Sequence, residues 1–419
     1  MAEQMCRSAF EKSKWINVFE KLKHISVKKT AYAGFKNRIK NLQLNILIMK
    51  QKKLLFTPGP FSTSATVKEA MLEDMGSRDA EFVNAVKEIR SELLRLAHVS
   101  QAAGYESIIM QGAGTFGIES VISSAIGNND MLLVLVNGAY GERIAKMAAI
   151  HKLNHYVLRF AEDEIVTPEA TEKFLNEHSD VTHVACIHSE TTTGLMNPVE
   201  AIGTVCKQHN KVFIVDAMSS FGGVQMNIQQ MQIDYLISSS NKCIEGVPGF
   251  AFVLCKKSEL EKTNGQARTL SLDLYEQWKG LEGNGQFRFT PPTLSIMAFR
   301  QAIKELDEEG GIAAREQRYK TNKKILDEGM RQLGFKEYLK PGIQGHIITS
   351  FLYPDDAGFD FEKFYNKLNN RGFIIYPGKL SKANAFRIGN IGQIFPDDVK
   401  GLIAAIKEVL EEEKVMAEA

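Results

Sequence analysis

The chain has 419 residues, of which 44% are hydrophobic and 24% are charged, and its formal net charge at pH 7 is +1. A chain of this length can bury a large core and normally forms two domains. A net charge so close to zero argues against a nucleic acid or a membrane surface as the partner.

The first 48 residues differ in charge from the rest. They hold ten Lys and Arg against three Asp and Glu, a net of +7, whereas the remainder holds 41 against 47, a net of −6. Such a basic segment can be a mitochondrial transit peptide, an arm outside the fold, or an extension without a role. The third alternative follows from Met49, which opens MKQKKLLFTPGP like a natural start. Residues 49–66 are then predicted to form an N-terminal arm.

Short, continuous apolar runs separated by amphipathic segments fill residues 67–300. Continuous runs are typical of strands covered on both faces. The runs are SIIM (107–110), MLLVLV (131–136), HVACI (183–187), VFIVD (212–216), YLIS (235–238) and FAFVL (250–254). Helix-like stretches such as GIESVISSAIG and EAIGTVCKQHN separate several of them. This order predicts an α/β fold with a mostly parallel sheet.

The pattern changes after about residue 300. Residues 297–334 form a long charged segment with a helical period, which is followed by HIITSFLY, FIIYPG and FRIGNIG and by a terminal helix pattern. We therefore expect residues 301–419 to form a smaller α+β domain built on a long helix.

Two charged residues follow predicted strands, at the sheet edge where sites of open parallel sheets lie. Asp216 closes VFIVD, and Lys242 follows YLISSSN. Asp216 can be a helix cap or a structural ion pair, and Lys242 a solvated surface charge. Alternatively, both serve pyridoxal phosphate. An acid keeps the ring nitrogen of that cofactor protonated, and a lysine forms a Schiff base with its aldehyde and then carries a proton.

A candidate phosphate cradle lies in QGAGTFGIES, residues 111–120. Backbone N–H groups at a helix start, together with the Thr115 hydroxyl, can hold a dianion. The stretch also contains Gly112, Gly114 and Gly117 in the G-x-G-x-x-G spacing of dinucleotide sites. That alternative is disfavoured because Asp130 precedes the next strand instead of ending it.

Seven ordered motifs resemble the class V, fold type I pyridoxal-phosphate aminotransferases. They are TPGP (57–60), GAGT (112–115), NGAYGER (137–143), HSETTTG (188–194), VDAMSSFGG (215–223), SSSNKCIEGVPG (238–249) and FRIGNIG (386–392). The resemblance covers about residues 54–412. SLDLYEQWK and RFTPPT are similar to the subgroup that acts on 2-aminoethylphosphonate and pyruvate.

The resemblance implies a seven-stranded, mostly parallel sheet in the large domain and pyridoxal 5'-phosphate as the cofactor. The implied cofactor-binding residues are Lys242 at the aldehyde, Asp216 at the ring nitrogen, Ala113, Gly114 and Thr115 at the phosphate, Tyr140 on the ring face and Thr191 at the ring hydroxyl. Lys242 and Asp216 are also the implied catalytic residues. Alternatively, Tyr140 is a half-buried turn residue and Thr191 bonds to a local backbone group.

For the substrates, the resemblance implies that Arg387 grips the anionic group, since a guanidinium pairs with a carboxylate or phosphonate. Arg387 can instead tie the two domains together. Gly59 and Ser62 are implied to close over the substrate, although turn chemistry also explains them. Thr290 would reach the cofactor phosphate of a second subunit, which implies a homodimer. Related enzymes have a tyrosine before this threonine, where this chain has residues 287–289, Phe-Arg-Phe.

The implied activity is transfer of the amino group of 2-aminoethylphosphonate to pyruvate, giving phosphonoacetaldehyde and L-alanine in phosphonate catabolism. An alanine–glyoxylate or serine–pyruvate activity is the nearest alternative, because pocket shape decides specificity. A lyase or desulfurase is a further one; a desulfurase needs a nucleophilic cysteine, and Cys243 is expected to be only a packed neighbour. A non-enzymatic cofactor-binding protein would not need all these groups.

The five cysteines are scattered, with neither a CxxC pair nor a metal-like spacing. Free thiols in a reducing compartment are therefore expected, and no metal site. We predict a cytoplasmic protein, or a mitochondrial one if residues 1–48 are a transit peptide.

Overall fold

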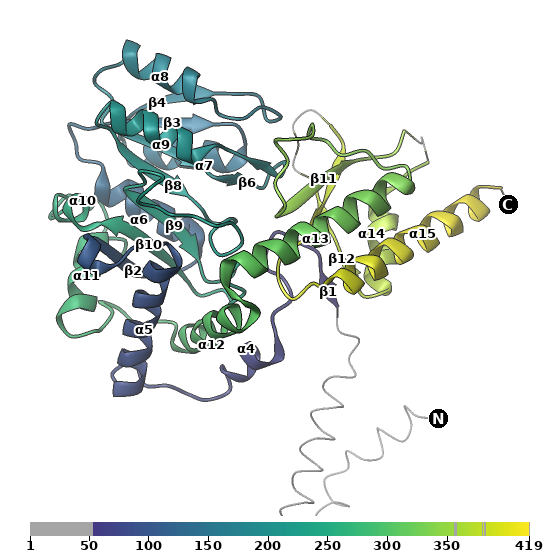
Figure 1. The fold of residues 1–419 in the computed structure, drawn as a ribbon, viewed down its shortest axis with the longest axis horizontal. Helices are drawn as coiled ribbons and strands as arrows, with labels where there is room; N and C mark the ends of the chain where they lie inside the picture. The colour runs from purple at the N-terminus through teal and green to yellow at the C-terminus, as the bar shows by residue number, and fades with distance from the viewer. Residues whose placement is uncertain (1–52, 356–357, 379, 381–382, 419) are drawn as a thin grey trace, which may run out of the picture. The chain divides into compact units, whose positions relative to one another are not determined.

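The computed structural model describes residues 53–418, except 356–357, 379 and 381–382. The predicted extension at residues 1–48, and the first four residues of the predicted arm, lie outside this part of the chain. The fold of the described residues is shown in Figure 1.

A seven-stranded sheet forms the larger layer, in the order β2-β10-β9-β8-β5-β3-β4. Only β10 runs antiparallel to its neighbours, so the prediction of a mostly parallel sheet is confirmed. The strands are β2 (Tyr105–Gln111), β3 (Met131–Val136), β4 (Asn154–Arg159), β5 (His183–Ile187), β8 (Val212–Asp216), β9 (Tyr235–Ser239) and β10 (Phe250–Lys256). The edge strand β4 was not recognised among the apolar runs, because its sequence NHYVLR is half-exposed and partly polar.

Helices pack against this sheet, for example α6 against β9 and β10, and α7 against β3 and β4. Side-chain N-caps begin several of them, including Ser64 for α4 and Thr167 for α8. The helices are α4 (Ala65–Glu69), α5 (Ala80–Leu96), the 3-10 helix η1 (Gln101–Ala103), α6 (Gly114–Ala125), α7 (Ala139–Ile150), α8 (Pro168–Glu177), α9 (Val199–Gln208), α10 (Lys257–Glu261), α11 (Leu274–Gly283) and α12 (Thr293–Glu309).

The segment predicted as one long helix is divided in two. Helix α12 ends at Glu309, and α13 (Gly311–Gln332) begins after a break at Gly310. Gly310 and Gly311 have φ values of +109° and +77°, a conformation that glycine adopts without strain. Helical period alone did not reveal the break, since the charged residues continue on both sides of it.

A second, three-stranded sheet follows, in the order β11-β14-β13. Helix α13 extends from the large sheet toward it, and α15 packs along α13 (Figure 1). The remaining elements are β1 (Leu54–Leu55), paired with β12 (Phe373–Ile374), the hairpin β6 (Ser189–Glu190) and β7 (Leu195–Met196), β11 (Ile348–Leu352), α14 (Phe361–Asn370), β13 (Tyr376–Pro377), β14 (Ala385–Gly389) and α15 (Pro396–Glu418).

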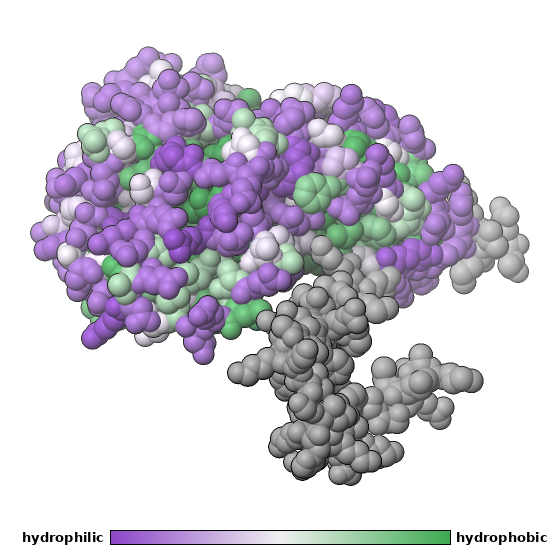
Figure 2. Space-filling model, turned by 60° about the horizontal axis from the view of Figure 1, so that its bottom comes forward, coloured by the Kyte–Doolittle hydropathy of each residue, from purple (hydrophilic) through white to green (hydrophobic). Residues whose placement is uncertain are grey.

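Two main hydrophobic clusters correspond to the two sheets. The larger one extends from Val67 to Ile312 in sequence, and the second gathers Phe56 with residues from Leu326 to Val409. The described residues nevertheless form one compact unit, so the domain boundary near residue 300 stays a prediction. Hydrophilic side chains predominate on the face in Figure 2, with hydrophobic ones in separate patches. Within the described part, none of the helices has the length and hydrophobicity that a bilayer-spanning helix requires.

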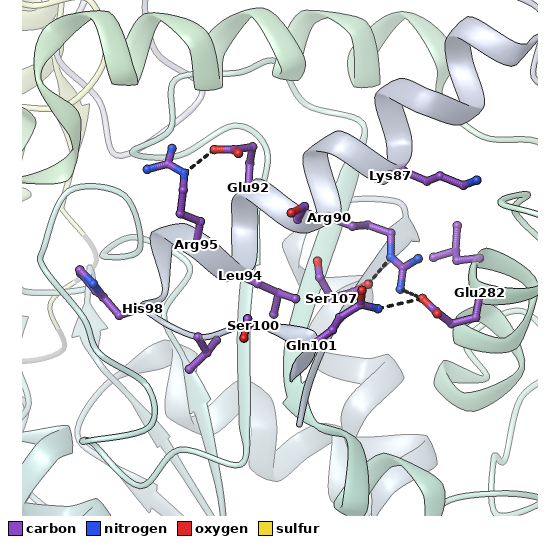
Figure 3. A pocket seen from close by; sticks show the side chains of 13 residues that line it. Lys87, Arg90, Glu92, Leu94, Arg95, His98, Ser100, Gln101, Ser107 and Glu282 are labelled. Carbon is purple, nitrogen blue, oxygen red and sulfur yellow. Dashed lines mark hydrogen bonds and ion pairs between the residues drawn. The ribbon is translucent and has the colours of Figure 1, made fainter. Parts of the chain in front are cut away.

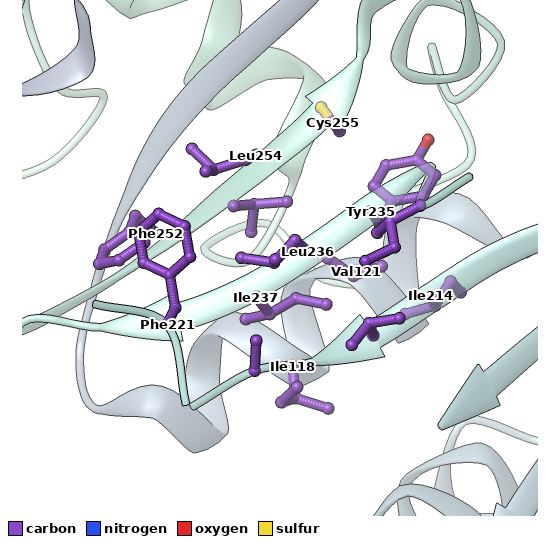
Figure 4. Close-up of a cluster of buried hydrophobic side chains, with 14 of the residues drawn as sticks. Ile118, Val121, Ile214, Phe221, Tyr235, Leu236, Ile237, Phe252, Leu254 and Cys255 are labelled. Atoms are coloured by element: carbon purple, nitrogen blue, oxygen red, sulfur yellow. The ribbon is translucent and has the colours of Figure 1, made fainter. Parts of the chain in front are cut away.

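The centre of the larger cluster lies at the middle strands of the large sheet (Figure 4). Side chains of β8 and β9 gather there with those of α6, among them Ile214, Ile237 and Ile118 (Figure 4). Phe252 on β10 is fully buried, and its ring lies 5.6 Å from that of Phe221 in an edge-to-face contact.

Replacing Phe252 by alanine is expected to lower the free energy of unfolding by about 3–5 kcal/mol, because the cavity cannot close between two strands and a helix. Urea unfolding followed by circular dichroism measures this change. Ile150→Ala is the matched control, since Ile150 is 64% exposed and should change stability by less than about 0.5 kcal/mol. Equal losses in the two variants would contradict this description of the core.

Candidate active site

The carboxyl ends of the parallel strands bring most of the predicted site residues to one edge of the large sheet. Strand β2 shares this direction, because it is antiparallel to β10, which is itself antiparallel to β9. Sites of open parallel sheets form at this edge. The residues located there are Ala113, Gly114 and Thr115 after β2, Tyr140 after β3, Thr191 after β5, Asp216 at the end of β8 and Lys242 after β9.

Lys242 lies between β9 and β10, and its Nζ donates a hydrogen bond of 2.5 Å to the carbonyl oxygen of Pro58. Gly59 approaches so closely that a Cβ there would lie 2.8 Å from this Nζ. Burial, together with the charges of Arg143 and Arg387, lowers the pKa of the Lys242 amine to about 8. More of this amine is therefore neutral near pH 7 than in an ordinary lysine, as a nucleophile requires.

A buried polar cluster fixes the loop that carries Lys242. The Glu245 carboxylate, 2% exposed, accepts hydrogen bonds from Arg318 at 2.8 Å, from the Tyr319 hydroxyl at 2.6 Å and from Gln393 at 2.7 Å. The Glu245 backbone N–H donates to the carbonyl oxygen of Lys242 at 2.7 Å. Arg318 and Tyr319 belong to α13 and Gln393 follows β14, so the cluster links the loop to the small sheet. Sequence reasoning missed it, because these partners are distant in sequence.

Asp216 is buried at the end of β8, and its Oδ1 accepts a hydrogen bond of 2.8 Å from the backbone N–H of Met218. Burial raises the pKa of the Asp216 carboxyl to about 6, and the charge of Glu190 acts in the same direction. In the described part of the chain, no lysine or arginine forms an ion pair with Asp216. A buried carboxylate needs a cationic or donor partner, and the protonated ring nitrogen of pyridoxal phosphate fits that need.

The predicted phosphate cradle is the N-terminus of α6. Ala113 is its N-cap residue and Gly114 its first residue, and the backbone N–H groups of Gly114 and Thr115 have no acceptor within the helix, whereas that of Phe116 donates to the Ala113 carbonyl oxygen. Gly114 is tightly placed, because a Cβ there would lie 2.4 Å from the Met218 sulfur. Such a helix start holds an anion well, and it lies beside the loop that follows Asp216.

The dinucleotide alternative is not supported by this geometry. Asp130 lies before β3, where its Oδ2 accepts a hydrogen bond of 2.7 Å from the Gly127 N–H and stabilises a turn. Gly117 serves helix packing, since a Cβ there would lie 2.6 Å from the Cβ of Ala251. No acid in this region therefore takes the place of the ribose-binding residue that the dinucleotide fingerprint requires.

Glu190 is a buried carboxylate that the sequence reading did not single out. It accepts hydrogen bonds from the Thr192 hydroxyl at 2.6 Å and from the backbone N–H groups of Tyr140 and Gly141 at 3.2 and 3.4 Å. Burial raises the pKa of the Glu190 carboxyl, while these hydrogen bonds lower it. Glu190 thus holds the start of α7, and with it Tyr140, against the loop after β5.

Arg387 is fully buried on β14 of the small sheet. Its guanidinium donates to the Thr191 carbonyl oxygen at 2.7 Å and to the Pro377 carbonyl oxygen at 3.1 and 2.9 Å, and it lies 5.0 Å from the Tyr376 ring. It therefore does link the two sheets, as the structural alternative proposed. Its remaining N–H groups stay available, and within the described residues it has no carboxylate partner. An unpaired buried cation fits an anionic substrate.

Ser62 and Thr290 have no described side-chain contact with this group, and Cys243 adjoins Lys242 in the chain without a contact that would make it a nucleophile. The Ser62 hydroxyl accepts the Leu55 N–H at 3.1 Å, and Thr290 is exposed, so the roles of Ser62 and Thr290 stay predictions. Cys243 is buried, and its Sγ donates to the Ser219 carbonyl oxygen at 3.1 Å. Burial raises the pKa of the Cys243 thiol to about 12, which is unsuited to the thiolate of a desulfurase.

A separate cavity of about 690 Å³ lies between α5, η1, β2 and α11 (Figure 3). It opens near the start of β2, the end opposite to the phosphate cradle. Its charged side chains largely pair with one another: Arg90 contacts Glu282, and Arg95 contacts Glu92. These groups carry no chemistry comparable to that around Lys242.

Solved structures share this fold. An alanine–glyoxylate aminotransferase from Nostoc sp. matches with a TM-score of 0.79 at 26% identity, over 86% of this chain and 95% of that one. A pyridoxamine–pyruvate aminotransferase from Mesorhizobium loti matches with a TM-score of 0.79 at 22% identity, over 87% and 93%. At 22% identity, the likeness to the Mesorhizobium loti enzyme shows only that the two proteins share a fold.

Sequence comparison is more specific. The family model for aminotransferase class V matches residues 62–384. A relative from Bacteroides fragilis, named 2-aminoethylphosphonate–pyruvate transaminase, is 50% identical over 357 residues, 85% of this chain and 98% of its own. A relative of the same name from Vibrio vulnificus is 50% identical over 364 residues, 86% and 99%. This chain therefore belongs to the class V aminotransferases, a family of enzymes that depend on pyridoxal phosphate.

Proposed function

We propose that this enzyme transfers the amino group of 2-aminoethylphosphonate to pyruvate, giving phosphonoacetaldehyde and L-alanine in phosphonate catabolism. Relatives that are 50% identical over nearly their whole length carry this activity in their names. The structural observation that carries the proposal is the burial of the Arg387 guanidinium, which has no carboxylate partner among the described residues. Its charge contributes to the lowered pKa of Lys242, so the two groups belong to one site. A donor with an amine at one end and an anion at the other needs both groups.

The chain's own residues have distinct tasks in this reaction. Pyridoxal 5'-phosphate, when bound, supplies the aldehyde that takes up the amino group and the ring that accepts electrons. The Lys242 amine holds the cofactor and, once released, accepts the proton from the substrate carbon that bears the nitrogen. Asp216 keeps negative charge at the ring nitrogen. Arg387 binds the phosphonate of the donor and later the carboxylate of pyruvate.

An alanine–glyoxylate or serine–pyruvate activity is the runner-up. The structural likeness to the Nostoc alanine–glyoxylate enzyme favours this activity, but the two sequences are only 26% identical, so this support is weak. The 50% identity of the phosphonate-named relatives favours the first proposal more strongly. 2-Aminoethylphosphonate, alanine and serine all carry an amine. They differ in the anionic group that Arg387 would bind, so this group decides between the two activities.

We also propose a homodimer with shared active sites. Thr290 is exposed and lies next to Phe289, which is 43% exposed. Leu270 and Phe116 are likewise exposed large apolar side chains, at 74% and 50%. Exposed apolar side chains beside a site residue are typical of a surface that a second subunit covers.

A screen of amino donors with pyruvate as acceptor tests the activity. We expect 2-aminoethylphosphonate to be the best donor, with release of phosphonoacetaldehyde, because it offers both an amine and a phosphonate. Lys242→Ala should lose turnover and the visible absorbance of bound cofactor, whereas Lys262→Ala, at an exposed lysine, should keep both. Preference for alanine or serine as donor would favour the runner-up instead, and turnover retained by Lys242→Ala would remove that lysine from its role.

Replacing Arg387 by lysine should raise the KM for 2-aminoethylphosphonate by about 10- to 100-fold, because an ammonium cannot replace a planar, two-pronged grip. The KM for pyruvate should rise as well, since one guanidinium serves both anions. Steady-state kinetics with each substrate measure the effect, and Arg371→Lys, at a partly buried arginine paired with Glu412, is the control. If Arg387 only ties the sheets together, the melting temperature falls while both KM values stay unchanged.

In the cofactor-free protein, the reaction of Lys242 with an amine-acylating reagent should show a midpoint near pH 8. The amine reacts only when neutral, and its lowered pKa moves that titration below the ordinary range of lysine. Mass spectrometry of the peptide that contains Lys242, with N-acetyl-lysine in the same solutions as the reference, measures the rate. A profile that coincides with that of the free amine would contradict the burial of this group.

A further inference from the structure

A second arginine stands at the predicted phosphate cradle. Arg143 lies on α7, and its Nη1 donates to the Thr115 hydroxyl oxygen at 3.2 Å. Its guanidinium carbon lies 4.8 Å from the centroid of the Tyr140 ring, within the range of a cation–π contact. Arg143 thus touches two residues that the family resemblance assigns to the cofactor, yet that resemblance gave Arg143 no role.

Arg143 is charged but not neutralised. Within the described residues no carboxylate pairs with it, whereas its neighbour Glu142 pairs with Arg159 at 2.8 Å instead. Its positive charge reaches the centre of the site, where it lowers the pKa values of both Lys242 and Asp216. An exposed arginine normally stays mobile in water. Here the ring and the hydroxyl hold the guanidinium in one place beside the cradle.

The remaining donors fit an anion. Because the Thr115 oxygen accepts from Arg143, the Thr115 hydroxyl proton is left to be donated to a further acceptor. The guanidinium also keeps N–H groups that this hydrogen bond does not use. A phosphate or phosphonate carries more negative charge than a carboxylate and offers three oxygens, which matches a guanidinium next to a hydroxyl.

We propose that Arg143 is a second anion-binding arginine of this site and grips a phosphorus oxyanion together with Thr115. Two sources share this chemistry: the phosphate of the cofactor and the phosphonate of the amino donor. The second source rests on the proposed function, and the first does not. A phosphonate donor would give the site a reason to hold two arginines, where a carboxylate donor is served by Arg387 alone.

Three variants test the proposal: Arg143→Gln, Arg143→Lys and the control Arg159→Gln. Arg159 is exposed and has its own carboxylate partner, so its loss should change each measured constant by less than about twofold. Two constants test the proposal. They are the dissociation constant for pyridoxal phosphate binding to the cofactor-free protein, by fluorescence titration, and the KM for 2-aminoethylphosphonate at saturating cofactor. The KM for L-alanine in the reverse direction is a third constant and serves as the reference for the second.

If the anion is the cofactor phosphate, Arg143→Gln should raise the dissociation constant by about 10- to 100-fold. In that case inorganic phosphate should stabilise the cofactor-free wild type against heat more than it stabilises the variant. If the anion is the phosphonate, the KM for 2-aminoethylphosphonate should rise by a similar factor while the KM for L-alanine changes little. Arg143→Lys should recover only part of either loss, because it restores charge without the planar fork.

If the dissociation constant of pyridoxal phosphate and the KM for 2-aminoethylphosphonate both stay within about twofold of wild type in Arg143→Gln, the proposal is overturned, whether or not the melting temperature falls. A fall would leave Arg143 as a structural partner of Tyr140. Should the wild type fail to use 2-aminoethylphosphonate at all, the proposed function falls and the phosphonate source is removed. The cofactor titration and the phosphate effect then decide on Arg143 by themselves.

Discussion

The site depends on keeping one lysine amine out of water without giving it a carboxylate as a direct partner. An ammonium ion buried in this way loses its hydration, so its proton is held less tightly. The Pro58 carbonyl and the close approach of Gly59 shield the amine from one side. Behind the loop, the Glu245 cluster fixes the backbone from which Lys242 extends. A mobile loop would let the amine reach solvent and regain its ordinary pKa.

The charged groups around this amine come from different elements of the fold. Asp216 and Glu190 bring two buried carboxylates from the large sheet, and the pKa values of both are raised by burial. Arg387 on β14 and Arg143 on α7 bring the cations, and neither is paired with an acid in the described residues. A site with this arrangement is incomplete until anions and a protonated ring enter it, which is the physical reason why it fits a phosphorylated cofactor and an anionic donor.

Much of this fold could be predicted from the sequence. Continuous apolar runs marked six of the seven large-sheet strands, because strands covered on both faces exclude polar residues. The edge strand β4 escaped, since one side of it meets solvent. The helix break at Gly310 also escaped, because a glycine pair interrupts the backbone without interrupting the charge pattern.

For the candidate site, the sequence predicted the position of Lys242 and Asp216 at the carboxyl edge of the sheet, because both follow strand ends. Contacts between distant segments could not be predicted. Glu190 meets the backbone of α7 some 50 residues earlier, and Glu245 meets α13 more than 70 residues later. Arg387 donates to the Thr191 carbonyl oxygen and keeps further N–H groups free. The sequence could not show that one side chain does both, because Thr191 is far from it in the chain.

The central claim is that the Lys242 amine is the covalent attachment point of the cofactor. Borohydride reduction of the enzyme loaded with pyridoxal phosphate, followed by digestion and mass spectrometry, locates that bond directly. The account predicts a single modified peptide with the pyridoxyl group on Lys242. A cofactor fixed to another lysine, or unmodified Lys242 in fully loaded enzyme, would contradict it.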